Sequence, residues 1–299
     1  DGLTVAGNVS VDGGTIKLDG NYPVGTNNVA LGDIALDDGS LSGNHNTAIG
    51  SGALTSNTSG AENTATGTSS LLQNTTGSYN TALGRFAMRF NTTASNNTAL
   101  GYQAAYSNST GSYITSVGYQ ALYSNTANNA DAFGYTALKN NTTGTDNVGL
   151  GKQGLFTNTT GASNTSVGSG TMYSNSTGSS NTAIGRSALR SNTTASFNTA
   201  VGYSAGYSNV SGVEMVALGY EALYASTATG NTGLGYRAGR NTTGDDNTFV
   251  GGFAGFDNTS GSSNTSLGFN SLSNNTTASN NTAVGMSALI SNSTGSNNT

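Results

Sequence analysis

The chain has 299 residues, of which 8% are charged and 34% are hydrophobic, with 44 glycines, one proline and no cysteine. This composition is unlike that of a globular enzyme. The 14 Tyr and 9 Phe at a formal net charge of −5 also argue against disorder, which usually accompanies few aromatics and high net charge. The acidic balance removes the electrostatic basis for binding nucleic acid, and no apolar stretch approaches the roughly 20 residues that span a membrane.

The first residues differ from the rest of the chain. Six of the 14 acids lie within residues 1–38, among glycine-rich alternating segments. We expect residues 1–25 to form an N-terminal β cap, adaptor or joining segment. Residues 26–299 are expected to form a shaft of repeats that continues beyond Thr299, since the sequence stops partway through another copy.

A glycine-anchored motif fills the rest of the sequence. Asn-Thr-Ala-Ile-Gly occupies residues 46–50, and Asn-Thr-Ala-Leu-Gly occupies residues 80–84 and 97–101. Nearly every interval between the anchoring glycines is 17 residues, with three of 16 and a first one of 18. These glycines are Gly32, Gly50, Gly67, Gly84, Gly101, Gly118, Gly134, Gly151, Gly168, Gly185, Gly202, Gly219, Gly235, Gly251, Gly268 and Gly285. Such a constant period indicates a repeat architecture.

The repeat unit itself predicts strands and turns. Its apolar runs of four or five residues, bounded by Gly, Asn and Ser, are too short for helices and fit strands. The Ser-Asn-Thr-Thr-Gly stretch is typical of turns, because Asn and Gly tolerate positive φ. One unit buries too little to be stable alone, so the copies must stack in parallel. We therefore predict an all-β protein, a parallel β-solenoid (β-roll) of about sixteen 17-residue repeats.

Stacking places equivalent side chains over one another. The asparagine that opens each motif should then form an amide ladder: Asn46, Asn63, Asn80, Asn97, Asn147, Asn164, Asn181 and Asn198. Ile114, Ala130 and Met215 interrupt this row, and we expect local irregularity there.

Side chains alternate along a strand, so the aliphatic residue and the alanine of each motif must face opposite ways. We expect the aliphatic side chains to fill the interior: Leu83, Leu100, Val117, Ile184 and Val201. The alanines would then form a smooth outer stripe: Ala82, Ala99, Ala183 and Ala200. A small-residue stripe lets another chain approach closely. Together with the thin core of each roll, it suggests a parallel homotrimeric fibre.

The unit Asn-(Thr/Ser)-Ala-(Ile/Leu)-Gly, followed by x-x-Ala-Leu, resembles the head repeats of trimeric autotransporter adhesins, which are trimeric left-handed β-rolls. The similarity recurs from Asn28 to Thr299, although the unit of 17 residues is longer than is usual in those heads. The opening Gly2-Leu3-Thr4-Val5 through Asp19-Gly20, with the Asn-Thr-Thr-Gly-Ser turns, resembles tail-fibre and virion structural proteins of tailed phages, especially those of cyanobacteria.

A row of tyrosines directly follows the anchoring glycines, and a second aromatic row lies four residues further on. The first row comprises Tyr102, Tyr119, Tyr135, Tyr203, Tyr220 and Tyr236. The second comprises Phe90, Tyr106, Tyr123, Phe156, Tyr173, Tyr207, Tyr224 and Phe256. Both rows can pack between turns or between chains with their phenol oxygens in solvent, and the first can also stack against a sugar.

Sequons of the form Asn-x-Ser/Thr recur at one turn position. They begin at Asn57, Asn74, Asn91, Asn108, Asn158, Asn175, Asn192, Asn258 and Asn292. Such asparagines accept N-glycans in a suitable secretory context, which makes a glycan-coated filament an alternative. Turn propensity alone also explains Asn and Thr there.

No catalytic, cofactor-binding or metal-binding residue stands out. His45 has no Cys, second His or spaced carboxylate beside it and fits a surface turn. Asp245 and Asp246, with Asp257 one strand later, form the best acidic cluster for a hard cation, but solvated turns are the favoured explanation. The hydroxyls recur with the repeat, whereas a nucleophile would need a singular base beside it. We expect no enzyme activity and no cofactor.

The predicted function is structural. We expect the shaft of a viral tail fibre that presents a receptor-binding tip for host attachment, located on the virion surface. The alternative is a bacterial extracellular filament or surface adhesin, possibly polymerising with itself. The expected partners are copies of the same chain and a cell-surface glycan receptor, with neither nucleic acid nor membrane insertion.

Overall fold

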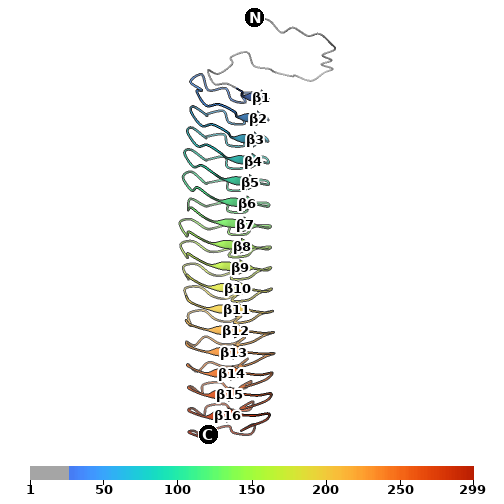
Figure 1. Ribbon diagram of the computed structural model, residues 1–299, viewed down its shortest axis with the longest axis vertical. Helices are drawn as coiled ribbons and strands as arrows, with labels where there is room; N and C mark the ends of the chain where they lie inside the picture. The colour runs from blue at the N-terminus through green and yellow to red at the C-terminus, as the bar shows by residue number, and fades with distance from the viewer. Residues whose placement is uncertain (1–26) are drawn as a thin grey trace, which may run out of the picture.

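The computed structural model describes residues 27–299, so the segment predicted to be a cap, residues 1–25, lies outside the described residues. Sixteen parallel strands follow one another in a single sheet and stack as a β-solenoid of about 15 turns, which forms a straight rod (Figure 1). The described residues contain no helix. The predicted fold class is confirmed.

Each strand has three residues. The bounds are β1 Val29–Leu31, β2 Thr47–Ile49, β3 Thr64–Thr66, β4 Thr81–Leu83, β5 Thr98–Leu100, β6 Thr115–Val117, β7 Asp131–Phe133, β8 Val148–Leu150, β9 Thr165–Val167, β10 Thr182–Ile184, β11 Thr199–Val201, β12 Val216–Leu218, β13 Thr232–Leu234, β14 Thr248–Val250, β15 Thr265–Leu267 and β16 Thr282–Val284. Every strand pairs in register with the next, as Ala82 does with Ala99.

The anchoring glycine ends each strand because no other residue fits there. Gly101 has φ of +134°, a conformation that L side chains rarely adopt. A methyl group on Gly101 would also lie 2.5 Å from the carbonyl oxygen of Gly118 in the next turn. The glycine row therefore meets two requirements at once, a left-handed φ and close stacking of backbones.

The wall opposite the strand is built from alternating left-handed residues that are not glycine. In the turn after β5, Gln103 and Ala105 have φ of 54° and 51°. In other turns the second of these positions holds a buried leucine, such as Leu71 or Leu122, with φ of 48° and 49°. A left-handed leucine costs about 1–2 kcal/mol. Complete burial of the side chain and a backbone hydrogen bond to the next turn offset that cost.

The interior is thin and is shared between the middle residue of the strand and the leucine of the opposite wall. A methyl group added at Gly149, the middle residue of β8, would lie 3.1 Å from Leu138. A larger side chain on the strand is matched by smaller residues on the opposite wall, so the total side-chain volume of the interior stays similar. Where Phe249 replaces the usual alanine, the facing positions are Gly239 and Gly255, and the phenylalanine ring occupies the space that side chains there would need.

The predicted amide ladder is confirmed, and it lies inside the rod. Asn80 illustrates it: its backbone N–H and its side-chain Nδ2 both donate to Oδ1 of Asn63, at 3.0 Å each, and Nδ2 also donates to the carbonyl of Ala94 at 2.9 Å. Irregularity was expected at Ile114, Ala130 and Met215. All three are buried and the sheet continues past each of them without a break, although the turn that leads to Ala130 is one residue shorter than usual.

Candidate binding face

The outward rows of the sheet are the reverse of those predicted. The alanine of each strand is buried, whereas the aliphatic residue is exposed, as Ala82 at 0% and Leu83 at 46% show. The predicted alanine stripe is therefore wrong, because the opposite wall already supplies the large side chains and leaves room only for a small residue beneath the strand. The outer surface instead carries an aliphatic row, defined as the third residue of each strand from β1 to β16.

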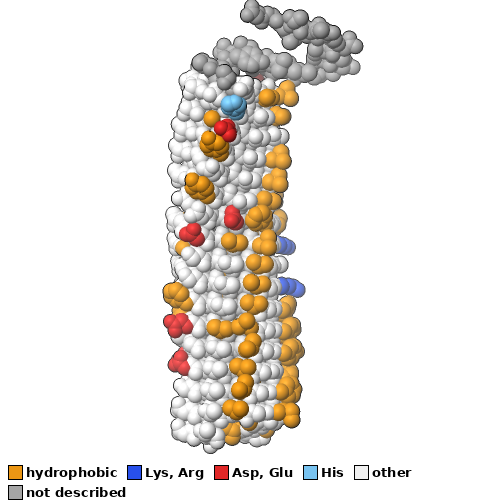
Figure 2. Space-filling model, in the orientation of Figure 1, with side chains coloured by type: hydrophobic (Ala, Val, Ile, Leu, Met, Phe, Trp, Pro, Cys, Tyr) orange, Lys and Arg blue, Asp and Glu red, His pale blue; other side chains and the backbone are white. Residues whose placement is uncertain are grey.

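The aliphatic row is continuous along the rod. Fifteen of its sixteen positions are apolar, with Thr66 as the exception, and no charged residue interrupts it. Many members are exposed: Leu31, Ile49, Leu83, Leu100, Phe133, Leu150, Ile184, Leu234, Leu267 and Val284. Figure 2 shows hydrophobic side chains in columns along the rod. A soluble monomer rarely exposes an apolar strip of this extent.

The sequon asparagines lie inside the rod. Eight of the nine have no exposed surface: Asn57, Asn74, Asn91, Asn108, Asn158, Asn175, Asn192 and Asn258. Their Nδ2 atoms are occupied: Nδ2 of Asn74 donates to Oδ1 of Asn57 at 2.8 Å and to the carbonyl of Gly77 at 2.9 Å. Asn292, in the last turn, is partly buried. A glycan on any of the eight would have to be accommodated inside the stacked turns, so the folded rod does not fit the glycan-coated alternative at these positions.

The first aromatic row is exposed, and its rings stack on one another. Neighbouring centroids in Tyr102, Tyr119 and Tyr135 are 5.4 and 5.3 Å apart, and those in Tyr203, Tyr220 and Tyr236 are 5.2 and 5.3 Å apart. The second row stacks in the same way at Tyr106–Tyr123, Phe156–Tyr173 and Tyr207–Tyr224. Neighbouring rings therefore cover most of the ring faces, and the hydroxyls and ring edges face outward.

In each turn, one residue belongs to the first aromatic row and another to the second. The residue that directly follows the first-row residue in the sequence lies between the two rows, and we call it the floor residue. The Lys and Arg side chains of the described residues all belong to these rows or this floor: Arg85, Arg89, Lys139, Lys152, Arg186, Arg190, Arg237 and Arg240. All eight lie over an aromatic ring, as Arg240 does over Tyr224 at 4.9 Å. We call this surface the cationic groove.

Acidic side chains gather on another part of the turn. Glu62, Asp146, Glu214 and Asp246 each directly precede the buried residue that opens a strand motif. Figure 2 shows acidic side chains on the face in view, away from the Lys and Arg side chains at its edge. These four acids are thus separated from the rows that carry the Lys and Arg side chains, whereas Glu221 lies among them.

Sequence reasoning based on the 17-residue period missed a longer repeat. The groove pattern of residues 85–151, the first block, returns 101 positions later in residues 186–252, the second block. Eight wall residues correspond in type: Arg85 and Arg186, Arg89 and Arg190, Tyr102 and Tyr203, Tyr106 and Tyr207, Tyr119 and Tyr220, Tyr123 and Tyr224, Tyr135 and Tyr236, and Lys139 and Arg240. The repeated Arg–Tyr–Tyr order was the signal that could have revealed it.

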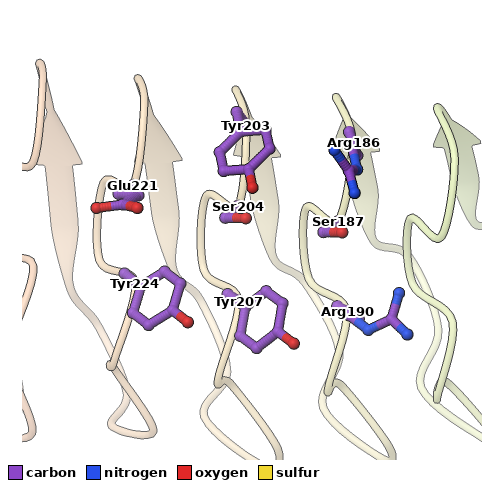
Figure 3. A pocket seen from close by; sticks show the side chains of 8 residues that line it. All are labelled: Arg186, Ser187, Arg190, Tyr203, Ser204, Tyr207, Glu221 and Tyr224. Carbon is purple, nitrogen blue, oxygen red and sulfur yellow. The ribbon is translucent and has the colours of Figure 1, made fainter.

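The floors of the two blocks differ, and only the second forms the hollow described here. In the first block, Phe86 lies on the floor with the guanidiniums of Arg85 and Arg89 over its ring at 4.4 and 5.0 Å, and Gln120 donates to Gln103 at 2.7 Å. In the second block the corresponding floor residues are Ser187, Ser204 and Glu221. There a hollow of about 380 Å³ opens between the walls (Figure 3). Its walls are Arg186, Arg190, Tyr203, Tyr207 and Tyr224.

The hollow ends at a carboxylate that pairs with two partly exposed arginines. Oε2 of Glu221 accepts from Nε of Arg237 at 3.0 Å and from Nε of Arg240 at 2.9 Å. Burial disfavours the charged form of this carboxyl, but the two guanidiniums outweigh burial and hold the pKa of Glu221 below its ordinary value. Glu221 is therefore ionised and fully compensated at neutral pH.

The remaining candidates do not assemble into sites. His45 is exposed in a turn, as predicted, and contacts Asn27 at 3.0 Å. Asp245 accepts from the backbone of Thr229, and Asp257 accepts from Asn241. Within residues 27–299 no group of three or more His, Cys, Asp or Glu side chains could hold a metal ion. The same residues contain no helix long and apolar enough to cross a membrane.

No family model, curated protein or solved structure matches this chain. The resemblance to adhesin heads and phage fibres therefore depends on the motifs alone. The class that the fold defines is the parallel β-solenoids built from tandem repeats.

Proposed function

We propose that this protein is the shaft of a structural fibre, most simply a viral tail fibre that holds a receptor-binding tip away from the virion for host attachment. One observation carries the proposal: a single sheet of sixteen parallel strands runs the length of the rod in unbroken register. Each turn is fixed to both neighbours by backbone bonds and by the buried asparagine ladder. Such a solenoid resists bending, which is what a spacer requires.

The fibre contains several copies of the chain, and a parallel homotrimer is the form we propose. The surface that supports self-association is the aliphatic row, in place of the alanines. Its side chains recur once per turn along the same line, so two rods in parallel can align their rows over the whole length. Burial of this strip yields about 25 cal/mol for each Å² of apolar surface removed from water.

Charge substitution in the aliphatic row tests this assembly. Replacing Leu83, Leu100 and Ile184 by Lys should convert an oligomer to a monomer in light scattering while leaving the β circular dichroism unchanged. The matched control places three lysines at exposed positions outside the row, Asn96, Ser263 and Asn280. A parent protein that is monomeric at all concentrations would refute the oligomer. Electron microscopy of native particles would test the location, since a tail fibre must project from a virion.

A self-polymerising extracellular filament is the second candidate, and the uninterrupted register of the sheet supports it. Every step from β1 to β16 pairs in the same parallel way, so one rod could be continued by another through the same backbone pairing. Filaments that lengthen from purified protein in the absence of any virion component would favour this candidate over the tail fibre.

A further inference from the structure

We propose that the hollow of the second block binds an acidic sugar unit of a polysaccharide, with the sugar carboxylate held between the guanidiniums of Arg186 and Arg190. This inference goes beyond the structural function: the shaft can hold a tip whether or not its side binds glycan, and the groove can bind glycan on a monomer or an oligomer.

The two positive charges at one end of the hollow have no acidic partner among the described residues. Arg186 and Arg190 form no ion pair among the described residues, and both line the hollow beside Ser187 (Figure 3). Their aromatic contacts are with different rings: Arg186 lies over Tyr203 at 5.9 Å and Arg190 over Tyr173 at 4.9 Å. In the first block the corresponding arginines both lie over Phe86, and Ser187 replaces this shared ring with a small side chain. Planar guanidinium groups suit a carboxylate, which they bind through paired hydrogen bonds.

The rest of the hollow offers hydroxyl groups. Tyr203, Tyr207 and Tyr224 line it with phenol side chains, and Ser187 and Ser204 form its floor. Because the rings stack on their neighbours at 5.0–5.2 Å, the walls present hydroxyls and edges in preference to free ring faces. A ligand that fits must donate and accept many hydrogen bonds around one anionic group. A sugar acid has this chemistry.

The far end of the hollow does not repel an anion. The carboxylate of Glu221 is neutralised by Arg237 and Arg240, so this end carries one net positive charge. The carboxylate can still accept a hydrogen bond from a sugar hydroxyl. The hollow spans three neighbouring turns, from Arg186 to Tyr224, and is open to solvent, so a sugar within a longer chain can enter it.

The spacing of the charges favours an acidic polysaccharide over nucleic acid. Cations occur in pairs separated by turns that carry only aromatic or neutral wall residues, such as the two turns of Tyr203 and Tyr220 between Arg186 and Arg237. Duplex DNA carries about one charge per 1.7 Å of its axis, a density that these sparse cations, on a chain with a net charge of −5, do not match. In an acidic polysaccharide the carboxylates are separated by uncharged groups, and this wider spacing of charges suits the widely spaced cations of the rod.

Calorimetric titration of the full chain with oligogalacturonate tests the proposal, with the methyl ester of the same oligomer as the neutral ligand. The acid should bind, and the ester should bind at least about tenfold more weakly, since it lacks the charge that strengthens hydrogen bonds to the guanidiniums. The double variant Arg186→Gln and Arg190→Gln should weaken binding of the acid by at least about tenfold.

The matched control lowers the net charge equally on another face. Asn96 and Asn280 are exposed at the position where other turns carry Asp146 or Asp246, so Asn96→Asp with Asn280→Asp keeps the local backbone and also removes two units of charge. This control should bind within about twofold of the parent. Equal binding of acid and ester, equal loss in both double variants, or tighter binding of single-stranded DNA of the same charge would overturn the proposal. Circular dichroism of each variant checks the fold.

Discussion

The two blocks of the rod share a scaffold and differ at its surface. Their walls correspond residue by residue, yet Phe86, Gln103 and Gln120 fill the floor of the first block, whereas Ser187 and Ser204 leave a hollow in the second. The strands beneath both floors pair in the same parallel register. The two blocks therefore share the backbone and the wall residues and differ in a few floor residues, which border the hollow of the second block.

The largest expected effect should be the same in both blocks, because it concerns the shared scaffold. Gly101→Ala and Gly202→Ala each place a methyl group against the glycine carbonyl of the next turn, at φ of +134° and +137°. Backbone strain of about 1–3 kcal/mol and overpacking of a similar size should add. Urea unfolding should show both variants destabilised by about 3 kcal/mol or more. Gly39→Ala, where an added methyl group meets no neighbour, is the control.

The buried asparagines at the sequon position of the turn should show the next largest effect on stability when they are replaced. Asn108 and Asn209 each donate from Nδ2 to a glycine carbonyl, at 2.7 and 2.9 Å, and accept from that glycine's N–H. Replacing either by Ala leaves buried backbone groups unpaired, at a cost of about 1–3 kcal/mol. The same unfolding measurement applies. A neutral result in either block would mean that the backbone alone holds the turns together.

The two blocks should differ in their affinity for the ligand. Ser187→Phe installs the floor residue of the first block, so it should fill the hollow and lower the affinity for oligogalacturonate about tenfold, roughly 1.4 kcal/mol. Conversely, Phe86→Ser with Gln103→Ser should open the first block. Calorimetry should then show a second equivalent of ligand per chain. Unchanged stoichiometry in the opened variant, with its fold intact, would show that the floor does not decide binding.

The smallest effect should be the pH dependence of the ion pair at the end of the hollow. Glu221→Gln copies Gln120 of the first block and should destabilise the rod by about 1 kcal/mol or less at neutral pH. The pKa of Glu221 is lower in the folded protein than in the unfolded chain, so its stabilisation is complete above the unfolded value. It is lost as the pH falls through the folded value. Thermal melts of parent and variant should therefore converge in acid.

The sequence by itself determined the period, the parallel stacking and the asparagine ladder. A constant spacing with a glycine at each strand end admits few other arrangements, and equivalent residues must then lie over one another. The row from Asn46 to Asn198 could be predicted for this reason, without knowledge of what surrounds it. The stacked tyrosines follow from the same reasoning.

Only the tertiary structure decided which side of each strand is inside. Alternation shows that Ala82 and Leu83 face opposite ways, but the choice depends on what the other wall contributes. That wall supplies large side chains from left-handed leucines such as Leu71, a conformation that propensity disfavours, so only alanine fits beneath the strand. The same thin interior buries the sequon asparagines. The gathering of cations and tyrosines around one hollow likewise depended on where each turn brings its floor and walls together.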